Sequence, residues 1–235
     1  MSYKRIMLKL SGEVFSGKHN FGIDHPTLAH VAKQITAVTK VAQVVVVVGG
    51  GNIWRYRDTK DSGIERTVSD AMGMLATIMN SVALQSALEF AGTHTRVLSA
   101  IDIPQLAEPF IKRKAQRHLE KGRVVICAGG TGNPYFTTDT AAALRAIETG
   151  AEVILKATRV DGVFSGDPLQ DSSATFFPEI SYLEILNRGL KVMDSAAISL
   201  CMDNRLPLVI FNAGTEGNLL RVVRGEAVGT RVGGR

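Results

Sequence analysis

Three short glycine-containing stretches of this sequence have the composition of phosphate-binding turns. They are KLSGE at Lys9–Glu13, GGGN at Gly49–Asn52 and GGTGN at Gly129–Asn133, and each comes at the end of an apolar run that predicts a β-strand. Glycine lets a backbone approach a phosphate closely, and a helix that begins nearby presents unpaired N–H groups and the positive end of its dipole. One such turn is weak evidence, because tight turns need glycine anyway. Three in one chain indicate an anionic ligand.

Charged residues near these stretches are of the kinds that phosphoryl transfer requires. Lys9 and Arg55 could neutralise a moving phosphoryl group, and Asp139 stands in the first turn of a predicted helix. Each also has an ordinary explanation. Lys9 could be a surface lysine and Arg55 a loop arginine. Asp139 could be a carboxylate that the helix dipole stabilises, and the same explanation applies to Asp70 at the start of the long predicted helix. The sequence contains neither GxxxxGK[ST] nor GxGxxG, which excludes a P-loop kinase and a dinucleotide fingerprint. The residues alone therefore indicate a phosphate-binding α/β enzyme, with a kinase as one hypothesis.

Alternating strands and helices predict a mostly parallel central sheet with helices on both faces. The valine run at Gln43–Val48 is apolar on both faces, which is typical of a strand buried between two helix layers. The other predicted strands are Tyr3–Leu10, Thr95–Ala100, Arg123–Cys127, Glu152–Lys156, Leu206–Phe211 and Gly229–Val232. The predicted helices are Asp24–Lys40, Val68–Ala91, Pro109–Lys121, Thr138–Thr149, Tyr182–Asn187, Asp194–Asn204 and Glu216–Arg224.

The composition, with 45% hydrophobic and 21% charged residues, is that of an ordinary globular protein. There is no run of 18 apolar residues and no secretion signal, so we expect a cytoplasmic protein without a membrane partner. Cys127 and Cys201 lie in apolar contexts, which predicts buried free thiols. The net charge of +5 suits polyanionic ligands. The basic run Ile111–Lys121 has no interleaved aromatic residues, so we expect no nucleic-acid partner.

Seven stretches, in order along nearly the whole chain, carry a family resemblance. They are KLSGE (Lys9–Glu13), FGID (Phe21–Asp24), GGGNIWR (Gly49–Arg55), SDAMGMLATIMN (Ser69–Asn80), TGNPYFTTD (Thr131–Asp139), LKATRVDGVFSGDP (Leu155–Pro168) and LKVMDSAA (Leu190–Ala197). With them the chain resembles the bacterial UMP (uridylate) kinases of the amino acid kinase family. The resemblance implies a three-layer α/β/α sandwich with an amino acid kinase-like fold. It also implies transfer of the γ-phosphoryl group of ATP to UMP in pyrimidine and CTP biosynthesis, with Mg²⁺ carried by ATP, in a homohexamer.

The resemblance further implies a division of the chain and a role for individual residues. Residues 1–235 are expected to form a single domain, with 1–155 as the UMP-binding and oligomerisation lobe and 156–235 as the ATP-binding lobe. The expected catalytic residues are Lys9, Asp139 and Arg55, with Asp139 organising the catalytic lysine. The expected ATP contacts are Lys9, Leu10, Ser11, Gly12, Gly51, Arg55, Thr158, Phe164 and Asp167. The expected UMP contacts are Gly50, Asp70, Thr131, Gly132, Asn133, Pro134, Tyr135, Phe136, Thr137 and Thr138. Lys156 is a further candidate for a phosphate-binding cation, and no residue is expected to hold a metal ion.

The residue types in TGNPYFTT suit a nucleoside monophosphate. The amide of Asn133, the threonine hydroxyls and the backbone N–H groups can hold it, and Pro134 biases Asn133 towards an extended conformation. Tyr135 and Phe136 offer apolar surface near a base, although either could instead pack in the core. The phosphate of UMP is largely ionised near neutral pH, because a phosphate monoester has a second pKa of about 6. The chemistry therefore requires alignment and positive charge rather than a strong general base.

The sequence leaves regulation and two other functions open. Many relatives carry Arg, Asp and His where this chain has Gln85, Ser86 and Glu89, so activation by GTP is in question even though Arg96 is retained. Feedback by UTP is left open by the sequence. One alternative is an enzyme of the same fold that phosphorylates a carboxylate or a carbamate; TGNPYFTT argues against it. The other is a non-catalytic nucleotide sensor, and the presence of both Lys9 and Asp139 argues against that.

Overall fold

The apolar strands pair into one nine-stranded sheet in the computed structural model, which describes residues 2–19, 21–56 and 63–234. The order across the sheet is β4-β3-β5-β2-β1-β6-β10-β11-β9, and every neighbouring pair is parallel except β10 and β11. The prediction of a mostly parallel sheet is thus confirmed. The strands are β1 (Arg5–Leu10), β2 (Gln43–Val48), β3 (Thr95–Ser99), β4 (Glu108–Pro109), β5 (Val124–Ala128), β6 (Val153–Thr158), β9 (Glu179–Ile180), β10 (Leu208–Asn212) and β11 (Thr230–Val232).

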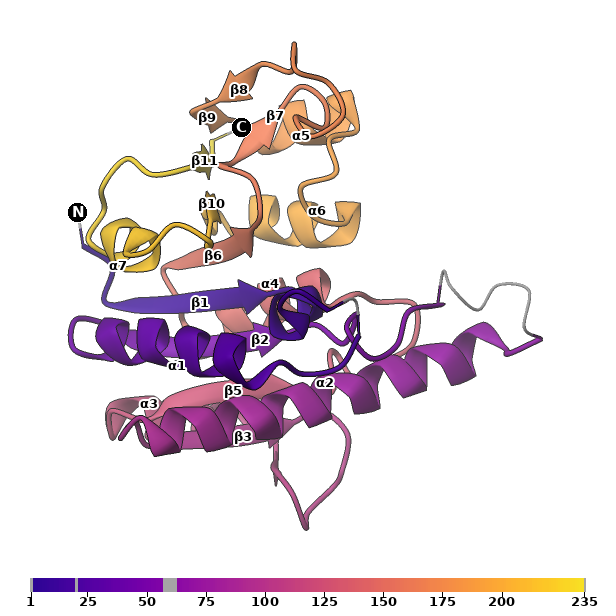
Figure 1. Cartoon of the computed structure of the whole chain (residues 1–235), viewed down its shortest axis with the longest axis vertical. Helices are drawn as coiled ribbons and strands as arrows, with labels where there is room; N and C mark the ends of the chain where they lie inside the picture. The colour runs from indigo at the N-terminus through magenta and orange to yellow at the C-terminus, as the bar shows by residue number, and fades with distance from the viewer. Residues whose placement is uncertain (1, 20, 57–62, 235) are drawn as a thin grey trace.

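Helices cover both faces of this sheet and complete a three-layer α/β/α sandwich (Figure 1). On one face lie α1 (His25–Thr39), α2 (Arg66–Phe90) and α7 (Asn218–Val223). On the other lie α3 (Lys112–Glu120), α4 (Thr138–Thr149), α5 (Tyr182–Arg188) and α6 (Ser195–Asp203). The alternating residues of β2 point into the two layers, with Val44 and Val46 in one core and Val45 and Val47 in the other. This burial on both faces explains why the strand is apolar throughout.

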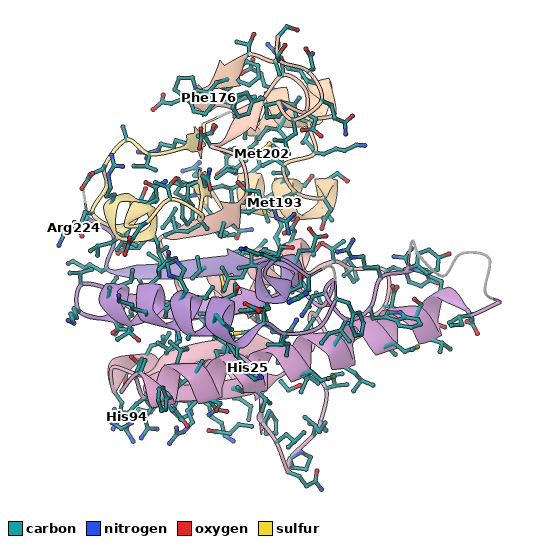
Figure 2. All side chains as sticks on the ribbon, viewed as in Figure 1. His25, His94, Phe176, Met193, Met202 and Arg224 are labelled. Carbon is teal, nitrogen blue, oxygen red and sulfur yellow. The ribbon has the colours of Figure 1, made fainter. Side chains whose placement is uncertain are left out.

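Short elements and element ends account for the differences from the predicted secondary structure. The helix predicted from Pro109 begins at Lys112 instead, because Glu108 and Pro109 form the edge strand β4 beside β3. Proline lacks an N–H group and is tolerated at such an edge. The structure also contains a short 3₁₀ helix, η1 (Gly12–Ser16), and a hairpin of β7 (Val163–Phe164) and β8 (Phe176–Phe177). These elements, like β9, are too short to show a hydrophobic period. Figure 2 shows Phe176 of the hairpin at the opposite end of the molecule from His94.

Helix α2, which the sequence predicted as the longest helix, is buried along one side and exposed along the other. By length and composition only, it is the one helix within the described ranges that could cross a membrane. Its buried residues include the polar side chains of Ser69, Thr77, Asn80 and Ser81, as in a core helix. On its exposed side it carries a set of apolar side chains, Val68, Leu75, Met79 and Phe90.

The structure confirms the prediction for the two cysteines but does not test the predicted division into two lobes. Cys127 and Cys201 are free and buried as predicted, and burial raises the pKa of both thiols to about 12. The division at residues 155 and 156 falls within β6, which pairs with β1 on one side and β10 on the other. The two lobes therefore share one continuous sheet, and the division stays a prediction.

Candidate active site

The three glycine-containing stretches meet at one edge of the sheet. They follow β1, β2 and β5, which lie side by side and run in the same direction. The carboxyl ends of parallel strands share an edge, and ligands of open α/β sheets bind there. The order β5-β2-β1 therefore brings KLSGE, GGGN and GGTGN together, as the sequence predicts for a phosphate site.

Two lysines share one buried carboxylate at this edge. Lys9 on β1 and Lys156 on β6 are direct neighbours in the register of the two parallel strands. Asp139 reaches them from the first turn of α4, with its Oδ1 2.8 Å from Lys9 Nζ and its Oδ2 2.8 Å from Lys156 Nζ. Lys156 also donates a hydrogen bond to the carbonyl of Val192. The structure thus joins Lys9 and Asp139 as predicted and adds Lys156 as an equal partner.

The charges of this cluster depend on one another. Burial by itself would raise the pKa of Asp139, but the two ammonium groups outweigh it and hold that pKa below the ordinary value of 3.8. Burial, with the nearby charge of Lys9, lowers the pKa of Lys156 below its ordinary value of 10.5, although Asp139 opposes this shift. A negatively charged ligand could take the place of Asp139 as the partner of either lysine.

The first two glycine turns are packed against each other. The N–H of Gly49 donates to the carbonyl of Leu10 over 2.9 Å. A Cβ added to Gly12 would lie 2.6 Å from Asn52 Oδ1 and 2.7 Å from both the Gly49 carbonyl oxygen and the Gly51 nitrogen. Gly12 is thus required by the close approach of KLSGE to GGGN.

Arg55 is held between these same two turns. Its Nη2 atom lies 2.7 Å from Glu13 Oε1, and its Nε donates to the carbonyl of Gly51. Glu13 was not among the predicted site residues, although it is the last residue of KLSGE. Its carboxylate fixes the position of a guanidinium beside the predicted phosphate-binding backbone.

The stretch from Thr131 to Thr138 forms an open loop anchored by Asp70. The Asp70 carboxylate accepts hydrogen bonds from the N–H of Tyr135 over 2.8 Å and from Arg66 Nε over 2.8 and 2.9 Å. Tyr135 has a φ of +70°, which is unusual for a residue with a side chain. The side chains of Tyr135 and Phe136 are 66% and 53% exposed, so neither packs in the core and both are open to a ligand.

Asp194 is a site residue that the sequence reasoning did not find. Its carboxylate accepts hydrogen bonds from the hydroxyls of Thr137 and Thr140, and it caps α6 by accepting the N–H of Ala197 over 2.8 Å. Thr137 in turn accepts the N–H of Asp139 over 3.0 Å as the cap of α4. Asp194 thus joins the starts of α4 and α6. The sequence signal was an aspartate followed by SAA, which predicts a helix cap but not its partners.

The three residues predicted to contact adenosine, Thr158, Phe164 and Asp167, do not line one common cavity among the described residues. Thr158 ends β6 and donates to the carbonyl of Val160 over 2.7 Å. Phe164 packs edge-on against Phe176, with ring centroids 5.2 Å apart, and Asp167 accepts the N–H of Leu169 over 3.0 Å. Thr158 lines a cavity of about 430 Å³ between the sheet and α1, which Phe164 and Asp167 do not line. Within the described residues, neither Phe164 nor Asp167 makes a hydrogen bond or ion pair to the lysine cluster.

The residues at this edge of the sheet fit a metal ion that is held mainly by the phosphates of a bound ligand and not by protein side chains. No group of three or more His, Cys, Asp or Glu residues able to hold a metal occurs in the part of the chain that the structure describes. Both carboxylate oxygens of Asp139 are already paired with lysines. Mg²⁺ is commonly held by substrate phosphates with few protein ligands.

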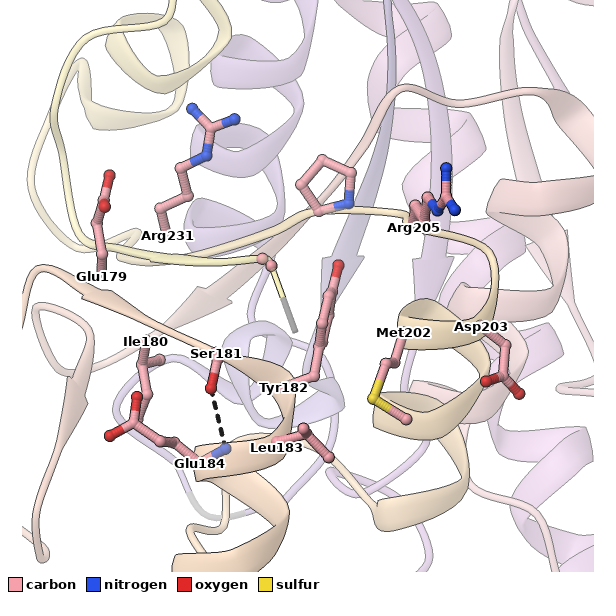
Figure 3. Close-up of a pocket in the computed structure, with 13 residues that line it drawn as sticks. Glu179, Ile180, Ser181, Tyr182, Leu183, Glu184, Met202, Asp203, Arg205 and Arg231 are labelled. Carbon is pink, nitrogen blue, oxygen red and sulfur yellow. Dashed lines mark hydrogen bonds between the residues drawn. The ribbon is translucent and has the colours of Figure 1, made fainter.

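A second hollow lies at the opposite edge of the sheet. Its volume is about 1230 Å³, and Pro207, which precedes β10, is among the residues that line it. Figure 3 shows Glu179, Arg231, Arg205 and Asp203 around it, with the Ser181 hydroxyl accepting the N–H of Glu184 over 3.1 Å. It is at the amino end of β10, far from the glycine turns, so it is not part of the candidate active site.

Comparisons with known proteins agree with this architecture. Residues 4–212 match the model of the amino acid kinase family. The structure is similar to the UMP kinase of Bacillus anthracis, with 37% identity, a TM-score of 0.96 and coverage of 99% of this chain and 97% of that one. It is similar to the UMP kinase of Ureaplasma parvum, with 37% identity, a TM-score of 0.93 and full coverage of both chains. The uridylate kinase of Archaeoglobus fulgidus is 32% identical, with a TM-score of 0.76, over 99% of this chain and 100% of that one.

The packing of the turns predicts that Gly12→Ala destabilises the protein. The added Cβ has backbone atoms of Gly49 and Gly51 within 2.7 Å, so KLSGE and GGGN must separate. We expect the free energy of unfolding in urea to fall by about 1–3 kcal/mol. Gly73→Ala is the matched control, because a Cβ there has no atom within 4 Å and alanine favours the helix. An unfolding free energy of Gly12→Ala equal to that of Gly73→Ala would contradict the close approach.

The low pKa of Asp139 predicts a pH-dependent contribution to stability. Because its pKa is lower in the folded than in the unfolded protein, the stabilisation is complete above the unfolded value and is lost as pH falls through the folded value. The difference in unfolding free energy between the wild type and Asp139→Asn should therefore stay constant down to about pH 5 and shrink as the pH falls further towards about pH 3. Urea titrations at several pH values measure it. A difference for Asp139→Asn that stays constant across this pH range would refute the prediction.

Proposed function

Since the chain belongs to the amino acid kinase family, we propose that it is an ATP-dependent UMP kinase, which converts ATP and UMP to ADP and UDP. The observation that carries this proposal is the cluster of Lys9, Asp139 and Lys156 between the glycine turns and the loop from Thr131 to Thr138. The proposal is also supported by the similarity of this chain, over nearly its full length, to proteins described as UMP kinases. The product UDP leads to pyrimidine nucleotides, including CTP, and the proposed location is the cytoplasm.

The lysine cluster supplies positive charge to the phosphoryl group in transfer. An oxygen of the UMP phosphate attacks the γ-phosphorus of ATP, and the bond from that phosphorus to the β,γ-bridging oxygen breaks, with its electron pair leaving on ADP. Lys9 and Lys156 face the same side of the sheet, so both ammonium groups can reach oxygens of one phosphoryl group. Asp139 keeps the two cations together before the anionic substrates bind. No general base is needed, because the UMP phosphate is already ionised.

The two sides of the site bind the two substrates. Ser11, Gly12, Gly51 and Arg55 are proposed to hold the ATP phosphates, with Glu13 keeping the guanidinium of Arg55 in place. Thr158, Phe164 and Asp167 remain the proposed contacts to adenosine, and Mg²⁺ enters on ATP. On the acceptor side, Asp70 is proposed to contact the ribose while it holds the backbone of Tyr135. The exposed rings of Tyr135 and Phe136 are available to the uracil base.

Assembly and regulation are part of the proposal. The apolar side chains of Val68, Leu75, Met79 and Phe90 on the exposed side of α2 support self-association, for which a homohexamer is proposed. On the same helix, Glu89 lies 3.5 Å from Arg96, and Gln85 donates to the carbonyl of Thr95 over 3.2 Å. Arg96 is therefore already paired within the chain, and any response to GTP or UTP has to compete with that ion pair.

A panel of acceptors tests the proposed function directly. ADP release from Mg-ATP is measured with UMP, dUMP, CMP, AMP, aspartate, glutamate and carbamate. We expect strong activity with UMP, because the acceptor loop offers amide, hydroxyl and aromatic groups for a nucleotide. Activity with an amino acid or carbamate instead would overturn the acceptor while retaining the lysine cluster. Protein that binds ATP but transfers to none of these acceptors would be a nucleotide sensor.

Substitutions in the lysine cluster test its role in turnover. Lys9→Ala and Asp139→Asn should each lower kcat by about 100-fold or more, because they remove charge stabilisation from the transition state. The KM for UMP should change far less, since the ion pairs of both side chains, among the described residues, are made within the lysine cluster and not with the acceptor loop. Steady-state kinetics on folded variants measure both constants. Lys121→Ala and Asp203→Asn, which change exposed residues, are the matched controls. Near-normal kcat in either cluster variant would remove that residue from the mechanism.

A further inference from the structure

Helix α2 contacts two of the glycine turns through two buried polar side chains. Thr77 and Asn80 lie one turn apart on this helix and are 3% and 0% exposed. Residues three apart lie on the same face of a helix. Neither residue belongs to the predicted substrate contacts, so their burial and polarity call for a different explanation.

Asn80 holds the turn after β2. Its side-chain amide donates to the carbonyl of Gly49 over 2.7 Å and to Asn52 Oδ1 over 2.7 Å. Asn52 Nδ2 donates back to Asn80 Oδ1 over 3.0 Å and to the carbonyl of Gly22 over 2.8 Å. Asn52 is itself only 1% exposed, so the two amides form a buried reciprocal pair. Such a network is rigid when all its members are satisfied.

Thr77 holds the turn after β5. Its hydroxyl accepts the N–H of Gly129 over 2.9 Å and donates to the carbonyl of Met74 over 2.7 Å. Gly129 has a φ of +75°, and a Cβ there would lie 2.9 Å from Ile101 Cγ1. The backbone of Gly129 is therefore confined on one side by Ile101 and bonded to α2 through Thr77.

The pairing of β2 with β5 stops just before these two turns. The paired register of β2 and β5 ends at Val47 and Cys127, before either glycine stretch begins. Beyond that point the N–H of Gly49 still donates to Leu10 of β1, while the carbonyl of Gly49 and the N–H of Gly129 are bonded to side chains of α2. The two turns are thus linked to each other through the spacing of Thr77 and Asn80 along α2.

We propose that Thr77 and Asn80 are positioning residues that set the distance between the turn at Gly49–Asn52, which contains the proposed ATP contact Gly51, and the turn at Gly129–Asn133, which leads into the proposed UMP loop. This inference rests on the proposed function, in which one turn lies beside the donor and the other leads into the acceptor loop. Neither side chain touches the reacting atoms. Each acts by aligning the donor and acceptor phosphates, and small misplacements of reacting groups can reduce turnover about 100-fold.

The test compares kcat and KM among variants of α2. Thr77→Val keeps the shape of the side chain but removes the hydroxyl, and Asn80→Leu removes the amide. Each should lower kcat at least tenfold with little change in the KM for ATP or UMP. Thr77→Ser should restore kcat, because it restores the hydroxyl. In the double variant the losses should be less than multiplicative, since either substitution already disturbs the same distance.

Ser81→Ala is the matched control for a merely structural role. Ser81 is fully buried on the same helix, but among the described residues its hydroxyl bonds only to the carbonyl of Thr77 and to neither turn. Its kcat should equal that of the wild type even where its Tm falls as much as that of Thr77→Val. If Thr77→Val keeps wild-type kcat, or if Ser81→Ala loses as much kcat, the positioning role is wrong. If the wild type itself does not phosphorylate UMP, the proposed function fails instead.

Discussion

The structure depends on one carboxylate that neutralises two neighbouring lysines. Lys9 and Lys156 stand side by side on adjacent strands, and in a nearly buried position their charges repel each other. Asp139 lies within 2.8 Å of both and compensates them. Removing one partner from a buried ion pair costs about 3–5 kcal/mol, so the cluster is held together only when all three groups are present. The same arrangement holds two cations where an anionic substrate can bind them. The contacts that stabilise this site are therefore also the ones that the proposed function requires.

The elements around the cluster are fixed by polar contacts that the sheet cannot supply. Parallel pairing brings the strand ends together, but the backbone beyond the last ladder bond is free to diverge. Side chains of α2 bond to the turns after β2 and β5, and Asp70 of the same helix bonds to the loop at Tyr135. One long helix therefore carries contacts to both sides of the proposed reaction. This explains why its buried face contains the polar residues Thr77 and Asn80 as well as apolar residues.

The two halves of the chain are joined at the site in a similar way. Asp194 caps α6 and accepts hydrogen bonds from Thr137 and Thr140 at the start of α4. Thr137 caps α4 beside Asp139, so the position of the Asp139 carboxylate depends on a residue more than fifty positions away. Glu13 has a comparable effect on Arg55. These contacts keep charged groups in place before the substrates arrive, which is the preorganisation that electrostatic catalysis requires.

The sequence by itself determined the layers of this protein and the kind of chemistry at its strand ends. Apolar runs such as β2, the alternation of strands and helices, and glycines after strands are local patterns, and local patterns are set by backbone geometry and burial. It also indicated Lys9, Arg55 and Asp139 as charged candidates, and the family resemblance added their roles. Only the tertiary structure decided that Lys156 shares Asp139, that Glu13 holds Arg55, that Asp194 joins the starts of α4 and α6, and that Thr77 and Asn80 bond to two of the glycine turns. These are contacts between residues distant in the chain, and strand order and register, which no local pattern encodes, bring them together.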